Sequence, residues 1–440
     1  MRRHVDSEVI AGLVDPDRIH RDVYVNELVF ERELEWLFPN VWMFVGHDSQ
    51  TPNHGDYFTT QIADQSVIQI RGSEGAMHVL HNRCPHKGTK LVIDREGNTG
   101  GFFRCPYHAW TFKTDGCLLA TPLGKGYAGL DHDSWREMNR VRSVGAVRNY
   151  GGFIFARLAS DGISFEEFFG DSLSTIDNLL ARSPVGRVEV AGPPLRYMHH
   201  CNWKMLVENQ TDTCHPMVAH ESSAGAAVLL WESLAPNDGG PIPPAMEIIA
   251  PFMSSYSFFE EMGIRTWPHG HGHTGVHHSI HSNYSQVPEY LECLEDAYGV
   301  ERTKAILGEN RHNTIYFPNV MVKASVQQLR NFIPVAVDRT LVESYVYRLI
   351  GAPDDLVRRS SIYNRMINAP TSVVGHDDLE MYERAHEGLK SNGNEWVNMQ
   401  RLFVEGEDFG TTEVVNGTSE RQMRNQMQAW RTFMLRGASA

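Results

Sequence analysis

The pattern of apolar and polar positions divides the chain into an N-terminal arm and two regions of different periodicity. Residues 1–39 alternate at roughly helical spacing, and residues 32–37 predict an amphipathic helix that ends before Pro39. From about residue 42 to residue 157, short β-branched and aromatic runs are separated by Gly, Asp and Asn, which predicts a small antiparallel β domain.

The rest of the chain mixes helical periodicity with strands predicted at 314–317, 325–337 and 341–349. Residues 236–244 consist of turn-forming residues and predict a loop. The expected fold class is therefore α+β. Its three parts are an arm (1–39) packed on the larger of two domains, a small antiparallel β domain (40–158), and that larger domain (159–440), which has an antiparallel sheet flanked by helices.

Length and charge narrow the classes of function. A chain of 440 residues is too long for one ordinary hydrophobic core, so two domains are expected. The formal charge of −14 argues against a nucleic-acid or anionic-membrane surface, which needs clustered positive charge. The sequence has no apolar run of membrane-spanning length and no apolar stretch behind its charged start. Its six cysteines are irregularly spaced, which favours a reducing cytoplasm.

Two short segments of the small domain carry metal-binding residue types. Cys84-x-His86 and Cys105-x-x-His108 are separated by 18 residues, and each offers one cysteine and one histidine. A Cys₂His₂ zinc finger instead groups its cysteines before its histidines. A [2Fe–2S] cluster of the Rieske type, with two cysteines on one iron and two histidines on the other, explains the alternation better. A structural zinc module stays open as an alternative.

A second constellation lies in the larger domain. His215 and His220 are five residues apart, so in a regular helix they diverge by roughly 140° and cannot chelate one ion. Pro216 removes a backbone donor directly after His215, and a bend there brings the imidazoles together. Two histidines and one carboxylate make a non-haem iron site with open positions. The segment 375–380 (Gly-His-Asp-Asp-Leu-Glu) is the best candidate for the carboxylate.

With both motifs in this order, the chain resembles the α subunit of the Rieske non-haem iron ring-hydroxylating oxygenases from about residue 40 to about residue 400. The resemblance implies that the small domain holds the Rieske cluster and the larger domain holds a mononuclear Fe(II). The implied cluster ligands are Cys84, His86, Cys105 and His108. The implied iron ligands are His215, His220 and Asp378, with Asp377 as the alternative third ligand.

The resemblance also implies a role for Asp212, which would link His215 to a cluster histidine, corresponding to His108, of a neighbouring subunit. Electrons would then cross a subunit boundary, so a trimer is implied, either α3 or α3β3 with a small β subunit. The electrons would come from NADH through a separate reductase, with or without a ferredoxin. The sequence contains no Gly-x-Gly-x-x-Gly fingerprint, in agreement with NADH binding on another protein.

The implied activity is oxygenation of an aromatic compound with O2 as co-substrate. The Asp-Asp-Leu-Glu element resembles the benzoate-like group more than the naphthalene-like one, which favours a small substituted or carboxylated arene. Monooxygenation or oxidative demethylation by the same iron is the alternative within the enzyme class. A Rieske electron carrier without oxygenase chemistry is the alternative outside it, and the large C-terminal domain counts against that alternative.

Three further features do not indicate ligands. Residues 268–281 hold six histidines, but the glycines among them predict a flexible surface loop with solvated imidazoles. Met423, Met427, Trp430 and Met434 recur at helical spacing and predict a packing stripe. Cys214 adjoins His215, and the default interpretation is a buried small thiol.

Overall fold

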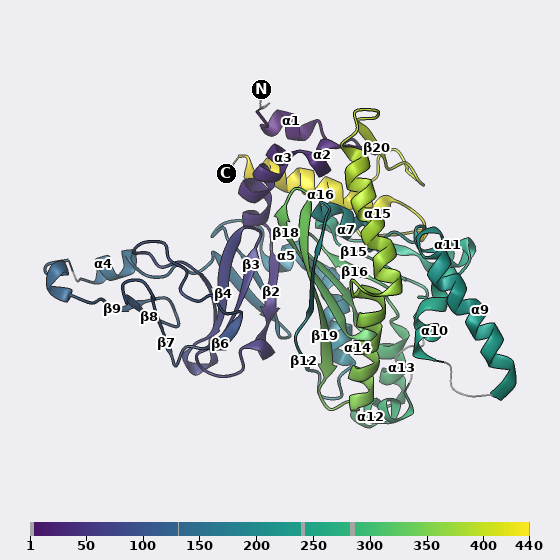
Figure 1. Ribbon diagram of the computed structural model, residues 1–440, viewed down its shortest axis with the longest axis horizontal. Coiled ribbons are helices and arrows are strands. Elements are labelled where there is room, and N and C mark those ends of the chain that lie inside the picture. Colours follow the sequence, from purple (N-terminus) through teal and green to yellow (C-terminus); the bar gives the residue numbers. More distant parts are fainter. Residues whose placement is uncertain (1–3, 131, 239–242, 282–286, 440) are drawn as a thin grey trace. The chain divides into compact units, whose positions relative to one another are not determined.

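The computed structural model describes residues 4–130, 132–238, 243–281 and 287–439 (Figure 1). The chain forms two compact units: Phe38–Ile163, and Met1–Leu37 together with Ser164–Ala440. The arm therefore belongs to the same unit as the C-terminal part of the chain. Within the described residues, no helix has the length and apolar character needed to cross a membrane.

The unit Phe38–Ile163 consists of three small antiparallel sheets, in the strand orders β10-β11-β2, β5-β4-β3-β6 and β7-β8-β9. Ile68 and Ile70 of β4 are fully buried in a core that also contains Cys84 and Cys105. The bounds are α4 Asp133–Met138, β2 Met43–His47, β3 Asp56–Ile62, β4 Gln65–Arg71, β5 Met77–His81, β6 Glu96–Asn98, β7 Phe102–Arg104, β8 Thr111–Lys113, β9 Leu118–Ala120, β10 Ala146–Tyr150 and β11 Phe153–Arg157.

The second unit is built on a nine-stranded antiparallel sheet in the order β12-β19-β18-β17-β16-β15-β14-β21, with β13 also paired to β19. A separate two-stranded sheet joins β1 of the arm to β20. The bounds are β1 Arg18–His20, β12 Val188–Val190, β13 Leu195–His199, β14 Ile264–Thr266, β15 Gly272–Thr274, β16 Thr314–Tyr316, β17 Val320–Lys323, β18 Gln328–Ala336, β19 Arg339–Leu349, β20 Trp396–Asn398 and β21 Glu413–Val415.

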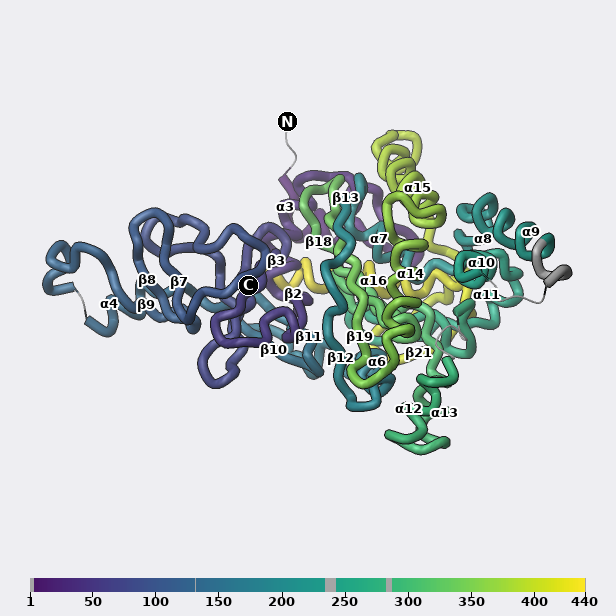
Figure 2. Tube along the Cα trace, turned by 60° about the horizontal axis from the view of Figure 1, so that its bottom comes forward, coloured from purple at the N-terminus to yellow at the C-terminus, as the bar shows by residue number. Residues whose placement is uncertain are grey.

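Helices pack against this sheet. The tube in Figure 2 shows α14 running along β19, and α15 follows α14 and contacts it. The C-terminal helix α16 packs against the arm and β14. The bounds are α1 Ser7–Ala11, α2 Asp22–Val25, α3 Glu27–Arg32, α5 Phe165–Phe169, α6 Ser174–Ala181, α7 Trp203–Asn209, α8 Pro216–Ala219, α9 Glu221–Asp238, α10 Pro244–Ile249, α11 Tyr256–Met262, α12 Pro288–Tyr298, α13 Val300–Gly308, α14 Asp354–Asn368, α15 Val373–Leu389 and α16 Arg421–Gly437.

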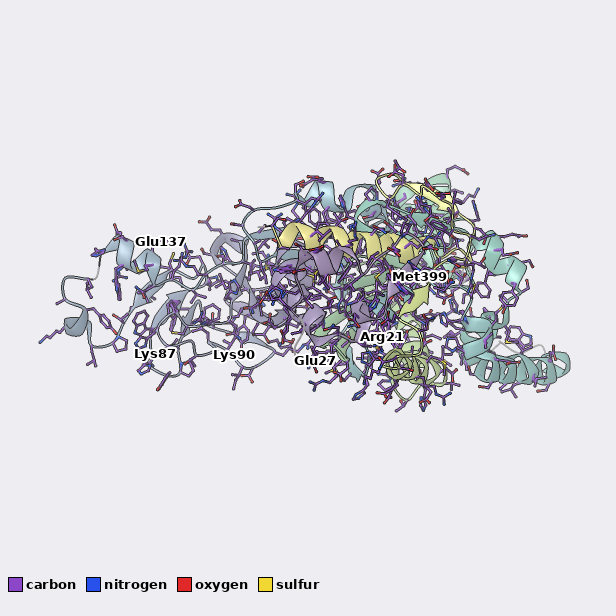
Figure 3. All side chains as sticks on the ribbon, turned by 90° about the horizontal axis from the view of Figure 1, so that it is seen from above. Arg21, Glu27, Lys87, Lys90, Glu137 and Met399 are labelled. Atoms are coloured by element: carbon purple, nitrogen blue, oxygen red, sulfur yellow. The ribbon has the colours of Figure 1, made fainter. Side chains whose placement is uncertain are left out.

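Polar contacts attach the arm to the rest of its unit. The Arg21 side chain, labelled in Figure 3, donates to the carbonyls of Leu389, Lys390 and Ser391 at the C-terminal end of α15. After α3 the chain continues as one π-helical turn, Glu33–Leu37, and then as a 3-10 turn, Phe38–Asn40. The predicted end of helical structure before Pro39 is therefore wrong by one short turn, which contains Pro39. The Glu33 carboxylate in the π-helical turn is fully buried and accepts hydrogen bonds from Nε1 of Trp203 and of Trp430.

The predicted α+β class is confirmed, and the predicted strands at 314–317, 325–337 and 341–349 correspond to β16, β18 and β19. The packing stripe is also confirmed, since Met427, Trp430 and Met434 of α16 are buried. The loop predicted at 236–244 is too long at both ends: α9 continues to Asp238 and α10 starts at Pro244. Residues 239–242 lie outside the described part of the chain.

The prediction of a solvated loop at 268–281 is wrong. This segment contains a short helical turn and strand β15, and the side chains of His271, His273 and His281 are buried. The His271 Nε2–H donates to the Phe168 carbonyl at 2.8 Å. The glycines allow close packing: a Cβ on Gly270 would lie 2.9 Å from the Phe317 ring, and Gly272 is still more crowded.

Candidate metal centres

The two Cys/His loops of the first unit have the same backbone turn. In each, the fourth residue after the cysteine has a positive φ, 77° at Gly88 and 55° at Ala109. The amide N–H of that residue donates to the cysteine carbonyl, at 2.9 Å from Gly88 to Cys84 and 3.0 Å from Ala109 to Cys105. In the first loop the backbone N–H groups of His86 and Lys87 donate to the Cys84 sulfur, as expected of a loop that stabilises negative charge.

The four predicted ligands come together at the tips of these loops. The Cys84 and Cys105 thiols hydrogen-bond to each other, and the His86 and His108 ring centroids are 4.6 Å apart. His86 stacks on Trp110 with 4.7 Å between centroids, which fixes its ring plane. Its Nδ1 atom is buried and has no hydrogen-bond partner among the described residues. Such an atom fits a metal ligand better than a structural imidazole.

The electrostatics of the loops suit the same ligand set. Burial raises the pKa of the Cys84 thiol to about 11, with the neighbouring Cys105 adding to the shift. A buried thiol becomes a thiolate when a metal ion supplies compensating charge. Burial, with the nearby His108 and Lys87, lowers the pKa of His86 and so favours the neutral imidazole that binds metals. Lys87 and Lys90 extend from the same loop into solvent (Figure 3).

The second pair of histidines flanks a very short helix. His215 is the N-cap residue of α8 and His220 is its C-cap residue, with Pro216 at the first helical position. Because the helix spans only Pro216–Ala219, the divergence of a regular helix does not apply, and the two ring centroids lie 5.5 Å apart. A new helix starts at Pro216, a position that suits proline because its missing N–H would have no partner there.

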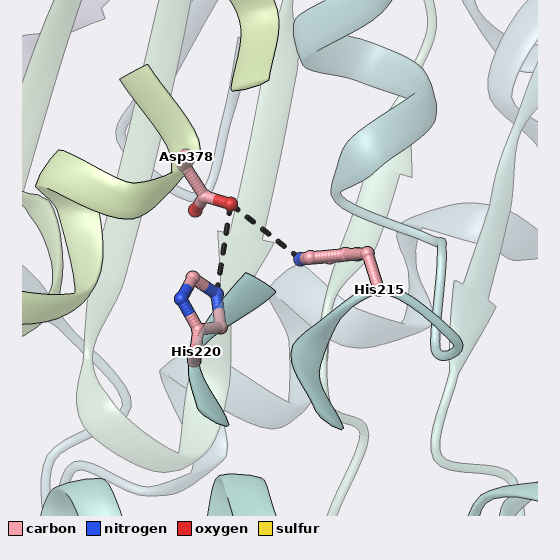
Figure 4. Close-up of side chains that lie close together, drawn as sticks. All are labelled: His215, His220 and Asp378. Carbon is pink, nitrogen blue, oxygen red and sulfur yellow. Dashed lines mark ion pairs between the residues drawn. The ribbon is translucent and has the colours of Figure 1, made fainter. Parts of the chain in front are cut away.

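Asp378 of α15 completes a group of three potential ligands (Figure 4). Its Oδ1 atom lies 3.6 Å from Nε2 of His215 and 3.5 Å from Nε2 of His220. The three ligand atoms lie within 4.8 Å of one another. Separations of 3.5–3.6 Å are longer than hydrogen bonds, so the atoms face a shared space instead of pairing directly. Two imidazoles and one carboxylate fit a non-haem iron.

The alternative third ligand, Asp377, contacts the other edge of the same imidazole. Its Oδ2 atom is 3.2 Å from Nδ1 of His220 and 3.1 Å from the Ser223 hydroxyl. Asp377 therefore orients His220 from behind, and the structure does not bring it to the group formed by the three ligand atoms. Cys214, which is half-buried, is also outside that group.

Asp212 is placed beside His215. Its Oδ1 atom accepts the backbone N–H of Cys214 at 2.7 Å, and its Oδ2 atom lies 3.8 Å from Nδ1 of His215. About a third of the Asp212 side chain is exposed. The carboxylate is thus held next to the candidate iron ligand while one oxygen remains accessible from outside this chain.

Several residues of the site were not predicted from the sequence. The Asn209 amide lies 3.2 Å from Nε2 of His215 and 3.4 Å from Asp378 Oδ1, and its own oxygen accepts from Gln210. A pocket opens at the three ligands and is lined by side chains of α7, α14, β17 and β18 and of the loop before β16. These include Asn209, His312, Met321, Gln328, Arg330 and Tyr363. The sequence gives little indication that these residues line a pocket. The clearest pattern is that the polar residues Gln328 and Arg330 interrupt an otherwise largely apolar strand.

Comparison with known proteins identifies both parts of the chain. Residues 41–130 match the Rieske [2Fe-2S] domain, and residues 189–436 match the catalytic domain of the ring-hydroxylating α subunit. The first match contains both Cys/His loops, and the second contains His215, His220 and Asp378. A Rieske cluster and a mononuclear iron are therefore the metal groups of this chain.

The relatives are oxygenase subunits. The chain is 28% identical to toluate 1,2-dioxygenase subunit alpha of Pseudomonas putida, covering 94% of this chain and 90% of that one. It is 34% identical over 219 residues to N,N-dimethyl phenylurea N-demethylase subunit alpha of a Sphingobium species, covering 50% and 46%. A structure of naphthalene 1,2-dioxygenase with indole in its active site has the same fold, with a TM-score of 0.76, 24% identity, and coverage of 96% and 94%. The chain belongs to the family of ring-hydroxylating oxygenase α subunits, and it is an enzyme of the Rieske oxygenase type.

Proposed function

We propose that this chain is the terminal oxygenase component that dihydroxylates a small aromatic substrate with O2 and electrons from NADH. The electrons reach it through a separate reductase, with or without a ferredoxin. One observation supports this most strongly: a Cys/His/Cys/His constellation and a His/His/Asp constellation occur in the same chain, each with the geometry of a metal site. An electron carrier needs the first and has no use for the second.

The types of donor atom indicate which residues would hold each metal group. Cys84 and Cys105 would hold one iron of the cluster, and His86 and His108 the other. His215, His220 and Asp378 would hold the mononuclear iron and leave positions open for O2 and substrate. The iron supplies oxygen activation when bound, while the protein orients the substrate and excludes water. The pocket lined by Met321, Phe252 and Ile367 provides the apolar surface for an aromatic ring.

Electron transfer would cross between subunits through Asp212. The support for this is the partly exposed Asp212 carboxylate beside His215 and the exposed position of His108 at its loop tip. A neighbouring copy that docked its His108 against Asp212 would complete a hydrogen-bonded path from one metal site to the other. This arrangement requires a ring of subunits, so we propose a trimer, α3 or α3β3 with a small β subunit, in the cytoplasm.

Monooxygenation, including oxidative demethylation, is the second candidate. The N-demethylase relative, identical at 34% over half of this chain, supports it. The same three iron ligands serve both reactions, so the distinction lies in which substrate atom is presented to the iron. The relation to toluate dioxygenase, which covers nearly the whole chain, favours dihydroxylation of the ring.

The test is turnover with isotopically labelled oxygen. The purified chain, loaded with iron and supplied with NADH and a Rieske-system reductase, would be incubated with substituted benzoates, toluene and N,N-dimethylaniline under ¹⁸O₂. A product with two labelled hydroxyl groups is expected. A product with one label, or formaldehyde release, would establish the second candidate. Reduction of the cluster without any oxygenated product, in protein with full iron content, would contradict both.

A further inference from the structure

The floor of the metal pocket is one face of the sheet, and that face has two buried cationic residues. In the register of β17 and β18, Met321 pairs with Arg330 and Lys323 pairs with Gln328. Directly paired residues, and residues two apart on one strand, point to the same face. Met321, Lys323, Gln328 and Arg330 therefore share a face, and three of them line the pocket that contains His215 and Asp378. Arg330 and Lys323 are both at least nine-tenths buried.

The Arg330 guanidinium is incompletely paired. It donates to Gln210 Oε1 at 2.9 Å and, more weakly, to the Tyr197 hydroxyl at 3.4 Å. Its Nε atom is buried and has no hydrogen-bond partner within the part of the chain that the structure describes. Among those residues, Arg330 also forms no ion pair within 4.0 Å. Although burial opposes the charge, Tyr197, Tyr382 and Asp378 together raise the pKa of Arg330, so the guanidinium stays charged and can bind an anion.

Lys323 contacts three neutral groups. Its Nζ lies 3.0 Å from Nδ1 of His281, 2.9 Å from Nδ1 of His312 and 3.0 Å from the Tyr363 hydroxyl. No carboxylate within the described ranges pairs with it. An amine that donates to Nδ1 of His312 leaves the ring proton on Nε2. The Ser279 hydroxyl lies 3.1 Å from the same Nδ1 and can donate to it as well. His312 lines the pocket and thus offers it an N–H donor.

Burial lowers the pKa of Lys323 well below its usual value, so Arg330 is the cation of this face that the acidic residues of the pocket would have to balance. The carboxylates that line it are Asp212 and Asp378. Asp378 belongs to the iron ligands, and Asp212 accepts backbone N–H groups beside His215. An Fe(II) ion adds two positive charges against the single negative charge of Asp378. The occupied site is then positive, and a ligand that carries negative charge restores the balance.

We propose that the pocket recognises an aromatic substrate through an anionic group, a carboxylate, which pairs with Arg330, while Lys323 is a positioning residue that directs the His312 Nε2–H into the pocket. This inference rests on the proposed function for the aromatic part of the substrate. Arg330 is suited to the role because a guanidinium binds a carboxylate through two parallel hydrogen bonds. The polar floor fixes the substrate by one end, and the apolar wall contacts its ring.

Equilibrium binding tests the inference without turnover. Iron-loaded protein, kept anaerobic with its cluster oxidised, would be titrated calorimetrically with matched pairs: benzoate and benzamide, phenylacetate and phenylacetamide, 1-naphthoate and 1-naphthamide. The carboxylate of at least one pair should bind about tenfold more tightly than its amide, or better, which is the usual range for a charge-assisted hydrogen bond. Amides that bind as tightly as the carboxylates, or no measurable carboxylate binding in any pair, would overturn the proposal.

Variants then test whether Arg330 and Lys323 cause the preference for the carboxylate. Arg330→Gln should abolish the preference for the carboxylate while amide affinity changes less than about threefold, and Arg330→Lys should restore part of it. Lys323→Met should reduce the preference severalfold, and Lys323→Gln, which keeps an N–H donor for His312, should reduce it less. A purely structural role would weaken both members of a pair equally. Arg339→Gln removes an exposed arginine from the same sheet and is the matched control.

Because neither reductant nor O2 is present, the outcome is independent of the reaction type. A carboxylate preference together with demethylase products would retain this inference and overturn the dihydroxylation. Equal affinity for acids and amides, together with labelled diol products, would overturn this inference and retain the dihydroxylation. Iron analysis of each variant, with one mononuclear iron retained, establishes that a lost preference does not come from a lost metal.

Discussion

Asp377 Oδ2 lies 3.2 Å from Nδ1 of His220, on the edge of the imidazole opposite to the one that faces Asp378. A carboxylate accepts hydrogen bonds, so this contact places the ring proton on Nδ1 and leaves the Nε2 lone pair for a metal. Two adjacent residues of α15 would therefore have different roles: Asp378 would be a ligand, and Asp377 would set the tautomer of the proposed ligand His220. The structure thus explains why two aspartates are adjacent in the sequence: they contact opposite edges of the same imidazole, which their spacing alone does not indicate.

The first prediction concerns these two aspartates. Asp378→Ala should remove the mononuclear iron, so that iron falls from about three per chain to about two, since the cluster contributes two irons. Asp377→Asn should keep the site but weaken iron binding by about 10- to 100-fold, the usual effect of losing the orienting partner of a histidine ligand. Iron analysis after stepwise dialysis against a chelator measures both.

In both variants the reduced Rieske electron paramagnetic resonance signal should be unchanged. Asp354→Asn, at an exposed position of α14, is the control and should keep all three irons. If Asp377→Ala lost the iron completely while Asp378→Ala retained it, the two residues would have to exchange roles.

The cluster loops give a second prediction. Cys105→Ser should abolish the cluster's visible absorption and its reduced-state signal, because it removes one of the two thiolates that hold the same iron. The mononuclear iron should remain, since its candidate ligands belong to the other compact unit. Cys117→Ser, in the same unit but outside the two loops, is the control and should keep the cluster. Loss of both metals from Cys105→Ser, in a folded protein, would contradict the independence of the sites.

The sequence was most informative where ligand chemistry requires particular residue types at short spacing. Cys84, His86, Cys105 and His108 lie on two short loops, and the alternation of ligand types at short spacing selected them. For His215 and His220 the five-residue spacing was weak evidence by itself, and the selection needed both Pro216, which lies between them, and the context of the rest of the chain. Asp378 comes from a helix 158 residues after His220, a separation that follows directly from the numbering. The need of a two-histidine site for a carboxylate selected the segment 375–380, and the family resemblance selected Asp378 within it.

The wrong prediction for residues 268–281 and the two pocket residues that were not predicted also have physical causes. The histidines of residues 268–281 look solvated because glycines usually indicate flexible loops, yet here Gly270 and Gly272 permit tight packing that buries His271 and His273. Arg330 and Lys323 were missed because a polar residue in a strand does not by itself indicate a site: Lys323 ends an apolar strand, and Arg330 lies between Gln328 and Asn331 in β18. Only the pairing of β17 with β18 shows that they share one face. Tertiary register is not encoded in local pattern.

A third prediction concerns the anchoring of the arm. Glu33 is fully buried, pairs with the buried Lys204 amine, and accepts from the indoles of Trp203 and Trp430. Glu33→Gln leaves Lys204 as a buried unpaired cation, which typically costs about 3–5 kcal/mol. The thermal midpoint should fall by several degrees. Glu35→Gln, two residues away at an exposed ion pair with Arg32, is the matched control and should change little. Equal midpoints for the two variants would show that the buried pair is not important for stability.

The last prediction is a pH dependence of stability that involves Glu208. Burial raises the pKa of this carboxyl group to about 7, even though the Tyr24 hydroxyl, at 2.7 Å, and Lys204 act in the opposite direction. The unfolded value is near 4.5. Between these two pH values the folded protein binds more protons than the unfolded chain, so this group makes stability fall as pH rises from about 4.5 to about 7.

Glu208→Gln carries no titratable proton and should lack this dependence. The free energy of unfolding of the variant, relative to the native protein, should therefore increase between pH 5 and pH 8 by an amount on the order of 3 kcal/mol. Urea unfolding at pH 5, 6, 7 and 8 measures this difference, and other titrating groups cancel because they are common to both proteins. Glu301→Gln, at an exposed position of α13, is the control and should give a difference independent of pH. A difference that is constant for Glu208→Gln as well, or that decreases with pH, would show that Glu208 is ionised in the folded protein throughout this range.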